Sequence, residues 1–153
     1  MSALPKDQLA YRRMAPDDLA VVADLERSLY EFPWSKGNFR DSLEAGYDCW
    51  VACDGPRVIG YAILMVAVDE AHLLNIAIAA GWQNQGIGRA FLGHVLDVAR
   101  EAKCQVVYLE VRPSNLAARH LYRDMGFQQI AIRPGYYPAR GGREDALFLG
   151  ITL

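Results

Sequence analysis

Apolar positions along the chain follow two periods, one typical of strands and one typical of helices. Alternating or continuous apolar residues predict strands, whereas apolar residues three and four positions apart predict amphipathic helices. Strands that alternate with helices in this order predict an α/β fold with a mixed central sheet of about seven strands and helices on both faces. Ser35 and Ser114 are the expected N-caps of the second and fourth helices. We expect strands over residues 9–13, 49–53, 57–68, 73–79, 105–111, 128–133 and 146–153, and helices over 16–29, 36–43, 87–102 and 115–125.

A single domain accounts for residues 1–153, because one domain usually takes about 100–200 residues and no repeat or linker divides the chain. A net charge of −2 argues against binding to a nucleic-acid backbone. The longest apolar run, residues 61–68, is far shorter than the about 20 residues of a membrane helix, so we expect no membrane span. The N-terminus lacks the apolar segment of a secretory signal, so we expect a cytoplasmic protein.

The cysteines and histidines do not form a recognisable metal site. Three cysteines without an export signal indicate reduced thiols. Cys49 and Cys53 lie in one expected strand, where four residues cover about 13 Å, too far for both sulfurs to bind one zinc ion. We therefore expect buried structural cysteines, no metal, and surface or packing roles for His72, His94 and His120.

A glycine-containing segment between the expected strand 73–79 and helix 87–102 is the most informative local motif. Gly86 and Gly88 let the backbone approach a ligand, and free amides at the start of a helix bind phosphate. The segment is not a Walker loop, because Gly86-Ile87-Gly88 stands where Gly-Lys-Ser/Thr is needed. It is not a dinucleotide fingerprint, because Phe91 occupies the place of the third small residue. An ordinary turn without a ligand is the alternative.

The pattern Gln83-x-x-Gly86-x-Gly88 resembles the pyrophosphate-binding loop of the GNAT superfamily of acetyl-CoA-dependent N-acetyltransferases. The resemblance continues through residues 109–127 and implies the GNAT fold, with acetyl-CoA as cosubstrate and no metal. Helix capping is an alternative role for one implied contact, Asn115. The cosubstrate contacts that the resemblance implies are Ile76, Ala77, Ile78, Gln83, Asn84, Gln85, Gly86, Ile87, Gly88, Arg89 and Asn115.

Acetyl transfer to an amine needs a base, a polarised carbonyl and an acid for the departing thiolate. Glu110 is a lone acid in an apolar strand, where partial burial makes a carboxylate a stronger base. Its alternative role is a strand-end acid paired with Arg112 or another cation. Tyr122 carries a phenol that can protonate a thiolate, with core packing as the alternative. The family motif implies the catalytic role for both residues, and a main-chain amide near Ile78 for the carbonyl.

The chain more closely resembles the bacterial ribosomal-protein alanine N-acetyltransferases of the RimI type. That resemblance rests on Phe32-Pro33-Trp34-Ser35, Asp69-Glu70-Ala71, Tyr136-Tyr137-Pro138 and residues 142–146. It implies a peptide N-terminus as acceptor, and aromatic walls that come from two loops. The alternative is that these aromatic side chains cover the edge of the core. The implied acceptor contacts are Phe32, Trp34, Tyr136 and Tyr137.

We therefore expect an N-α-acetyltransferase that moves acetyl from acetyl-CoA to the N-terminal amine, usually of alanine, of a small-subunit ribosomal protein or another protein. We expect a monomer or weak dimer that binds no nucleic acid directly, and a mobile loop over residues 135–142. Pro134-Gly135 and Arg140 depart from the family pattern and put the preferred peptide in question. Two alternatives stay open: a same-fold acetyltransferase for a lysine side chain or small amine, and a non-catalytic acyl-CoA-binding module.

Overall fold

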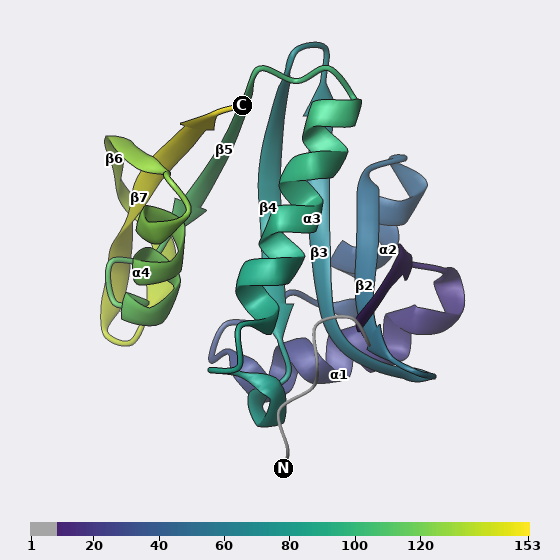
Figure 1. Cartoon of the computed structure of the whole chain (residues 1–153). Helices are drawn as coiled ribbons and strands as arrows, with labels where there is room; N and C mark the ends of the chain where they lie inside the picture. Colours follow the sequence, from purple (N-terminus) through teal and green to yellow (C-terminus); the bar gives the residue numbers. More distant parts are fainter. Residues whose placement is uncertain (1–8) are drawn as a thin grey trace.

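The computed structural model describes residues 9–153, which form one seven-stranded sheet with helices on both of its faces (Figure 1). The strands lie in the order β1-β2-β3-β4-β5-β7-β6, and β4 and β5 form the one parallel pair in this sheet. This mixed sheet confirms the expected fold class. The strands are β1 (Leu9–Arg13), β2 (Asp48–Asp54), β3 (Arg57–Ala67), β4 (Glu70–Ile78), β5 (Val106–Val111), β6 (Gln128–Ala139) and β7 (Gly142–Thr152).

Two groups of helices cover the two faces of the sheet. Side chains of α1 and α2 belong to a core cluster with Tyr61 and Ala77, whereas those of α3 and α4 belong to a second cluster with Leu109. No helix within residues 9–153 is long and apolar enough to cross a membrane. The described α-helices are α1 (Leu19–Leu29), α2 (Lys36–Glu44), α3 (Ile87–Glu101) and α4 (Leu116–Asp124).

Two helix starts differ from the expected ones. Pro16–Asp18 forms a 3-10 turn, so α1 begins at Leu19. Asn115 rather than Ser114 caps α4, because the side chain of Asn115 accepts a hydrogen bond of 3.2 Å from the amide of Ala118. Ser114 is occupied by another contact, since its amide and hydroxyl both donate to Glu144. The expected cap of α2 by Ser35 is confirmed.

Most of the segment 135–142, expected as a loop, belongs to the strands β6 and β7. Pro134-Gly135 suggests a strand break, but the β6–β7 register absorbs it in an irregularity between Arg133 and Tyr137. Side chains of β7 also hold the Gly135 backbone: Asp145 accepts from its amide at 2.9 Å, and Arg143 donates to its carbonyl at 2.6 Å. The second half of β6 therefore presents its side chains from a paired strand.

All three cysteines are buried free thiols, which confirms the expectation for them. Burial raises the pKa of the Cys49 thiol to about 11, with a smaller contribution in the same direction from Asp48. Within residues 9–153, no group of three or more His, Cys, Asp or Glu side chains is arranged to hold a metal ion.

The parallel strands β4 and β5 stay together over only part of their length. Their register covers three pairs and ends with His72 opposite Tyr108. Beyond that point β4 continues beside β3, whereas β5 continues beside β7, and Figure 1 shows the two strands moving apart. We call this region the splay, formed by residues 73–78 of β4 and 109–111 of β5. Main-chain groups of β4 that face the splay have no strand partner there.

Candidate active site

Glu110 lies in the splay, two residues beyond the last β4–β5 pair. Its neighbours Leu109 and Val111 belong to the core cluster with α3, so Glu110 faces the side of the sheet that carries α1 and α2. The Glu110 side chain is 9% exposed and both of its oxygens have partners. Nε2 of His72 contacts Oε2, and Nε of Arg133 lies 3.5 Å from Oε1.

The cation beside Glu110 is Arg133 and not Arg112, so the alternative of a strand-end acid paired with another cation also describes this carboxylate. Arg112 is engaged elsewhere, since its Nη1 donates to the carbonyl of Pro138 at 2.8 Å and to Glu144 Oε1 at 3.2 Å. Glu110 instead contacts His72 and Arg133, which come from β4 and β6. Strand β5 therefore carries a mostly buried carboxylate that is contacted by the adjacent strand β4 and, across β7, by the edge strand β6.

Tyr122 lies on α4 and is buried, with its ring packed edge-on against Phe127 at a centroid distance of 5.5 Å. Burial, together with the nearby phenols of Tyr30 and Tyr137, raises the pKa of Tyr122 far above its usual value. Its hydroxyl therefore keeps its proton at any physiological pH. Tyr30 follows α1 and Tyr137 lies on β6, so both phenols that affect Tyr122 come from other elements.

A second buried carboxylate, Glu26 of α1, lies on the same side of the sheet as Glu110. Its Oε1 accepts hydrogen bonds from the Tyr61 hydroxyl at 2.8 Å and from Asn75 Nδ2 at 3.0 Å, and its Oε2 accepts one from the Trp34 amide at 3.0 Å. Glu26 is 3% exposed. It thus ties α1 to β3, to the β4 side of the splay and to the segment between α1 and α2.

The four expected acceptor residues divide into two groups. Phe32 and Tyr137 flank the Arg112 guanidinium, whose carbon lies 5.5 Å and 4.4 Å from their ring centroids, and Tyr136 packs edge-on against Tyr137 at 4.9 Å. Trp34 instead packs against Phe39 of the core at 5.1 Å. The structure therefore brings Phe32, from the segment after α1, together with Tyr136 and Tyr137 of β6. Trp34 packs on the edge of the core, as the alternative expected.

The glycine motif joins the end of β4 to the start of α3. Gly86 has a φ of +78°, which favours glycine, and it precedes the first turn of α3, whose amides have no partner within the helix. Gln83 Nε2 donates to the carbonyl of Ile78 at 2.9 Å and fixes the motif to β4. A Cβ on Gly88 would lie 3.7 Å from Ile78 Cγ1 and 3.9 Å from Leu121 Cδ2. The start of α3 therefore adjoins both β4 and α4.

The expected cosubstrate contacts thus come from elements that meet at the splay. Ile76, Ala77 and Ile78 lie on its β4 side, and Asn115 precedes α4 on its β5 side. Asn84, Gln85, Ile87 and Arg89 lie in or beside the glycine motif, where Asn84 adopts a left-handed φ of +61°.

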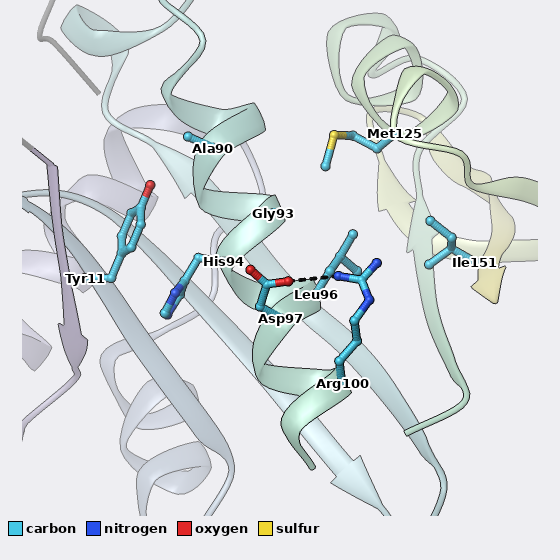
Figure 2. Close-up of a pocket in the computed structure, with 9 residues that line it drawn as sticks. All are labelled: Tyr11, Ala90, Gly93, His94, Leu96, Asp97, Arg100, Met125 and Ile151. Atoms are coloured by element: carbon cyan, nitrogen blue, oxygen red, sulfur yellow. Dashed lines mark hydrogen bonds and ion pairs between the residues drawn. The ribbon is translucent and has the colours of Figure 1, made fainter. Parts of the chain in front are cut away.

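A cavity of about 490 Å³ runs along the outer side of α3 rather than through the splay (Figure 2). None of the expected site residues lines it. An ion pair between Asp97 and Arg100, with 2.9 Å between Nη1 and Oδ1, lies in its wall. The lining residues are Tyr11, Ala90, Gly93, His94, Leu96, Asp97, Arg100, Met125 and Ile151.

Sequence reasoning gave no site role to three residues around the site: Arg133, Glu26 and His72, and for His72 it expected only a surface or packing role. His72 and Glu110 are 38 positions apart and meet only because α3 returns the chain to a parallel strand, so no local spacing indicates their contact. Glu26 did carry a readable signal. It continues the apolar stripe of Leu19, Val22 and Ala23 on α1, and an acid on the buried stripe of a helix indicates a polar partner in the core.

Comparisons with known proteins point in one direction. A model of the acetyltransferase (GNAT) family matches residues 19–127. The [ribosomal protein bS18]-alanine N-acetyltransferase of Escherichia coli strain K12 is 37% identical over 136 residues, which covers 89% of this chain and 92% of that protein. The crystal structure of the ribosomal-protein-S18-alanine N-acetyltransferase from Escherichia coli superposes with a TM-score of 0.88 at 35% identity, covering 94% and 93% of the two chains.

A more distant structure, Arabidopsis thaliana NAA60 in complex with acetyl-CoA, shares the fold. It superposes with a TM-score of 0.85 at 19% identity, and the match covers 95% of this chain and 98% of that one.

Proposed function

The chain belongs to the GNAT family of acetyltransferases, and we propose that it transfers acetyl from acetyl-CoA to the N-terminal α-amine, usually of alanine, of a ribosomal protein. The observation that carries this proposal is the mostly buried Glu110 in the splay, facing the side from which Phe32, Tyr136 and Tyr137 are presented. The named activity of the relatives, which match this chain over nearly its whole length, supports the same acceptor. A ribosomal-protein acceptor implies a cytoplasmic enzyme.

The residues present fit acetyl-CoA. The start of α3 suits a pyrophosphate group. Gly86 has a left-handed backbone conformation, and the first-turn amides of α3, which have no partner within the helix, offer several N–H donors at the positive end of the helix dipole. The unpaired β4 main chain in the splay offers hydrogen-bond partners for the amide groups of a pantetheine arm. When bound, acetyl-CoA supplies an activated thioester. Ile76, Ala77, Ile78, Asn115 and the glycine motif would hold it.

Glu110 acts as the general base. A protein α-amine has a pKa of about 7.7–8.0, so much of it is protonated at neutral pH and must lose a proton before it attacks. The Glu110 carboxylate takes this proton, directly or through a water molecule, from an amine that enters from the α1 and α2 side. As the N–C bond forms and the C–S bond breaks, the acetyl group moves to the amine and the electron pair remains on sulfur.

Tyr122 acts as the general acid. Its raised pKa keeps the hydroxyl protonated, so it donates a hydrogen bond to the leaving sulfur throughout the pH range of activity. Burial also raises the pKa of a thiolate formed beside the phenol, so the transfer exchanges one buried anion for another and the two desolvation effects largely cancel.

The aromatic residues around Arg112 form the acceptor side. Phe32, Tyr136 and Tyr137 supply apolar walls for a small first side chain, and Arg112 sits between two of them while paired with Glu144. These walls come from the segment after α1 and from β6, so an extended peptide end would lie between the two.

Steady-state transfer to a short peptide with a free N-terminal alanine tests the assigned roles. We expect Glu110→Gln and Tyr122→Phe each to lower kcat about 10²–10⁴-fold while acetyl-CoA still binds with unchanged affinity. The matched control is Glu101→Gln at the exposed end of α3, which should keep full activity. Full activity in Glu110→Gln contradicts the role of the base. Transfer to a polyamine but to no peptide contradicts the proposed acceptor.

A further inference from the structure

His72 contacts the proposed base at the point where the two parallel strands separate. Its register partner on β5 is Tyr108, but its Nε2 reaches Oε2 of Glu110, two residues further along the strand. Two residues of a strand span about 6.6 Å, so the imidazole leans along β5 into the splay instead of pointing straight across the pair. The contact therefore joins β4 to the carboxylate just beyond the last ladder bonds between the strands.

The surroundings hold the imidazole in this direction. Its ring packs edge-on against Phe148 of β7 at a centroid distance of 6.3 Å, and Phe148 in turn stacks on Tyr108 at 5.2 Å. His72 has a side chain only 23% exposed. An imidazole that is wedged against one ring and bonded to one carboxylate has little rotational freedom, so it defines where Glu110 Oε2 lies.

Charged and titratable groups of β6 lie beside this pair, and Tyr108 of β5 packs against the same Phe148 ring as His72. Arg133 Nε lies 3.5 Å from Glu110 Oε1, and the Arg133 guanidinium carbon lies 4.7 Å from the centroid of the Phe148 ring. Tyr136 and Tyr137 are close enough for the charge of Glu110 to contribute to their raised pKa values, although burial is the larger cause for both. Glu110 is therefore fixed by His72 at one oxygen and approached by Arg133 at the other.

We propose that His72 is a positioning residue for the general base, one that holds Glu110 Oε1 toward the acceptor by bonding Oε2. The proposal rests on the proposed function. With Glu110 ionised, Nε2 carries the proton and donates to Oε2, which fixes the carboxylate plane. Arg133 lies 3.5 Å from Oε1, and the second lone pair of Oε1 takes the proton of the amine.

Three variants test this role in the full-length protein with acetyl-CoA and the alanine peptide. His72→Leu removes the donor, and we expect kcat to fall about tenfold or more, with the KM for acetyl-CoA unchanged. His72→Gln keeps an N–H donor at this position, so it should recover part of kcat. His120→Gln is the matched control, because His120 is an exposed histidine paired only with Asp124 on α4.

The double variant of His72→Leu with Glu110→Gln separates the inference from the function on which it rests. If Glu110 is the base and His72 acts through it, the double variant is no slower than Glu110→Gln alone. If Glu110→Gln is inactive while His72→Leu and His72→Gln match the wild type in kcat, the proposal for His72 is overturned and the base stands. If Glu110→Gln is fully active, both fail. In His72→Leu, a lower melting temperature with unchanged kcat would indicate a merely structural histidine and would also overturn the proposal.

Discussion

The hydrogen bonds around Glu26 predict a large loss of stability when one donor to its buried carboxylate is removed. Tyr61 is fully buried, and its hydroxyl donates to Glu26 Oε1 at 2.8 Å. Burial, reinforced by Glu26, raises the pKa of Tyr61 far above its usual value, so the phenol stays a neutral donor. Tyr61→Phe deletes this donor and leaves the carboxylate with two partners, Asn75 and Trp34.

The size of the loss follows from the kind of bond. A hydrogen bond to a charged group contributes about 1.5–3 kcal/mol, so Tyr61→Phe should reduce the free energy of unfolding by about 2 kcal/mol. For a domain of this size, that corresponds to a fall of about 4–8 °C in melting temperature. Glu26→Gln should cost about 3 kcal/mol, because the amide nitrogen replaces an acceptor and leaves one buried N–H without a partner.

Urea unfolding followed by circular dichroism measures both losses, and the double variant measures their coupling. Because the two residues share one bond, the double variant should lose about 1 kcal/mol less than the sum of the single losses. Glu44→Ala, at an exposed glutamate at the end of α2, is the control and should change stability by less than about 0.5 kcal/mol. Additive losses, or a loss below that threshold in Tyr61→Phe, would refute the network as a source of stability.

Three further predictions concern other parts of the chain. Gly86→Ala places a side chain at a φ of +78°, so it should cost about 1 kcal/mol of stability and raise the KM for acetyl-CoA, whereas Gly93→Ala within α3 should not raise this KM. Burial lowers the pKa of His94 below 6.5 in the folded protein, so the unfolded chain binds a proton more readily in acid. The free energy of unfolding should therefore fall as pH drops below 6.5. Thermal melts of His94→Phe should show a smaller fall over the same pH range. Because burial raises the pKa of Cys49 to about 11, mass spectrometry should find this thiol unmodified by iodoacetamide at pH 7.5 in the native protein and modified in urea.

The sequence was sufficient to predict the sheet and the segments that carry the candidate site, because the signals for these elements are local, whereas the roles of the site residues came from the family resemblance and stay predictions. The apolar stripe of α3, the glycines that precede it and the buried strand around Glu110 all lie within single segments. The prediction ended the strand at residue 133, before Pro134-Gly135, whereas β6 continues to Ala139. Pairing with β7 outweighs the weak local preference of these two residues for a turn.

Contacts between distant segments could not be predicted from the sequence pattern. The sequence shows His72 and Glu110 in separate strands, but their contact depends on where the parallel register ends. The same holds for Arg133, which reaches Glu110 across β7 from the edge strand. Side-chain partners of this kind follow from the tertiary arrangement, since each strand alone is compatible with several registers.

The most direct test of the proposed N-α-acetylation is to locate the acetyl group on an acceptor that offers both kinds of amine. The acceptor is a peptide with a free N-terminal alanine and an internal lysine, incubated with acetyl-CoA and the enzyme, and the modified nitrogen is identified by tandem mass spectrometry. We expect acetyl on the alanine α-nitrogen alone, and no product with Glu110→Gln. Acetyl on the lysine Nζ, with the α-amine left free, would contradict the account.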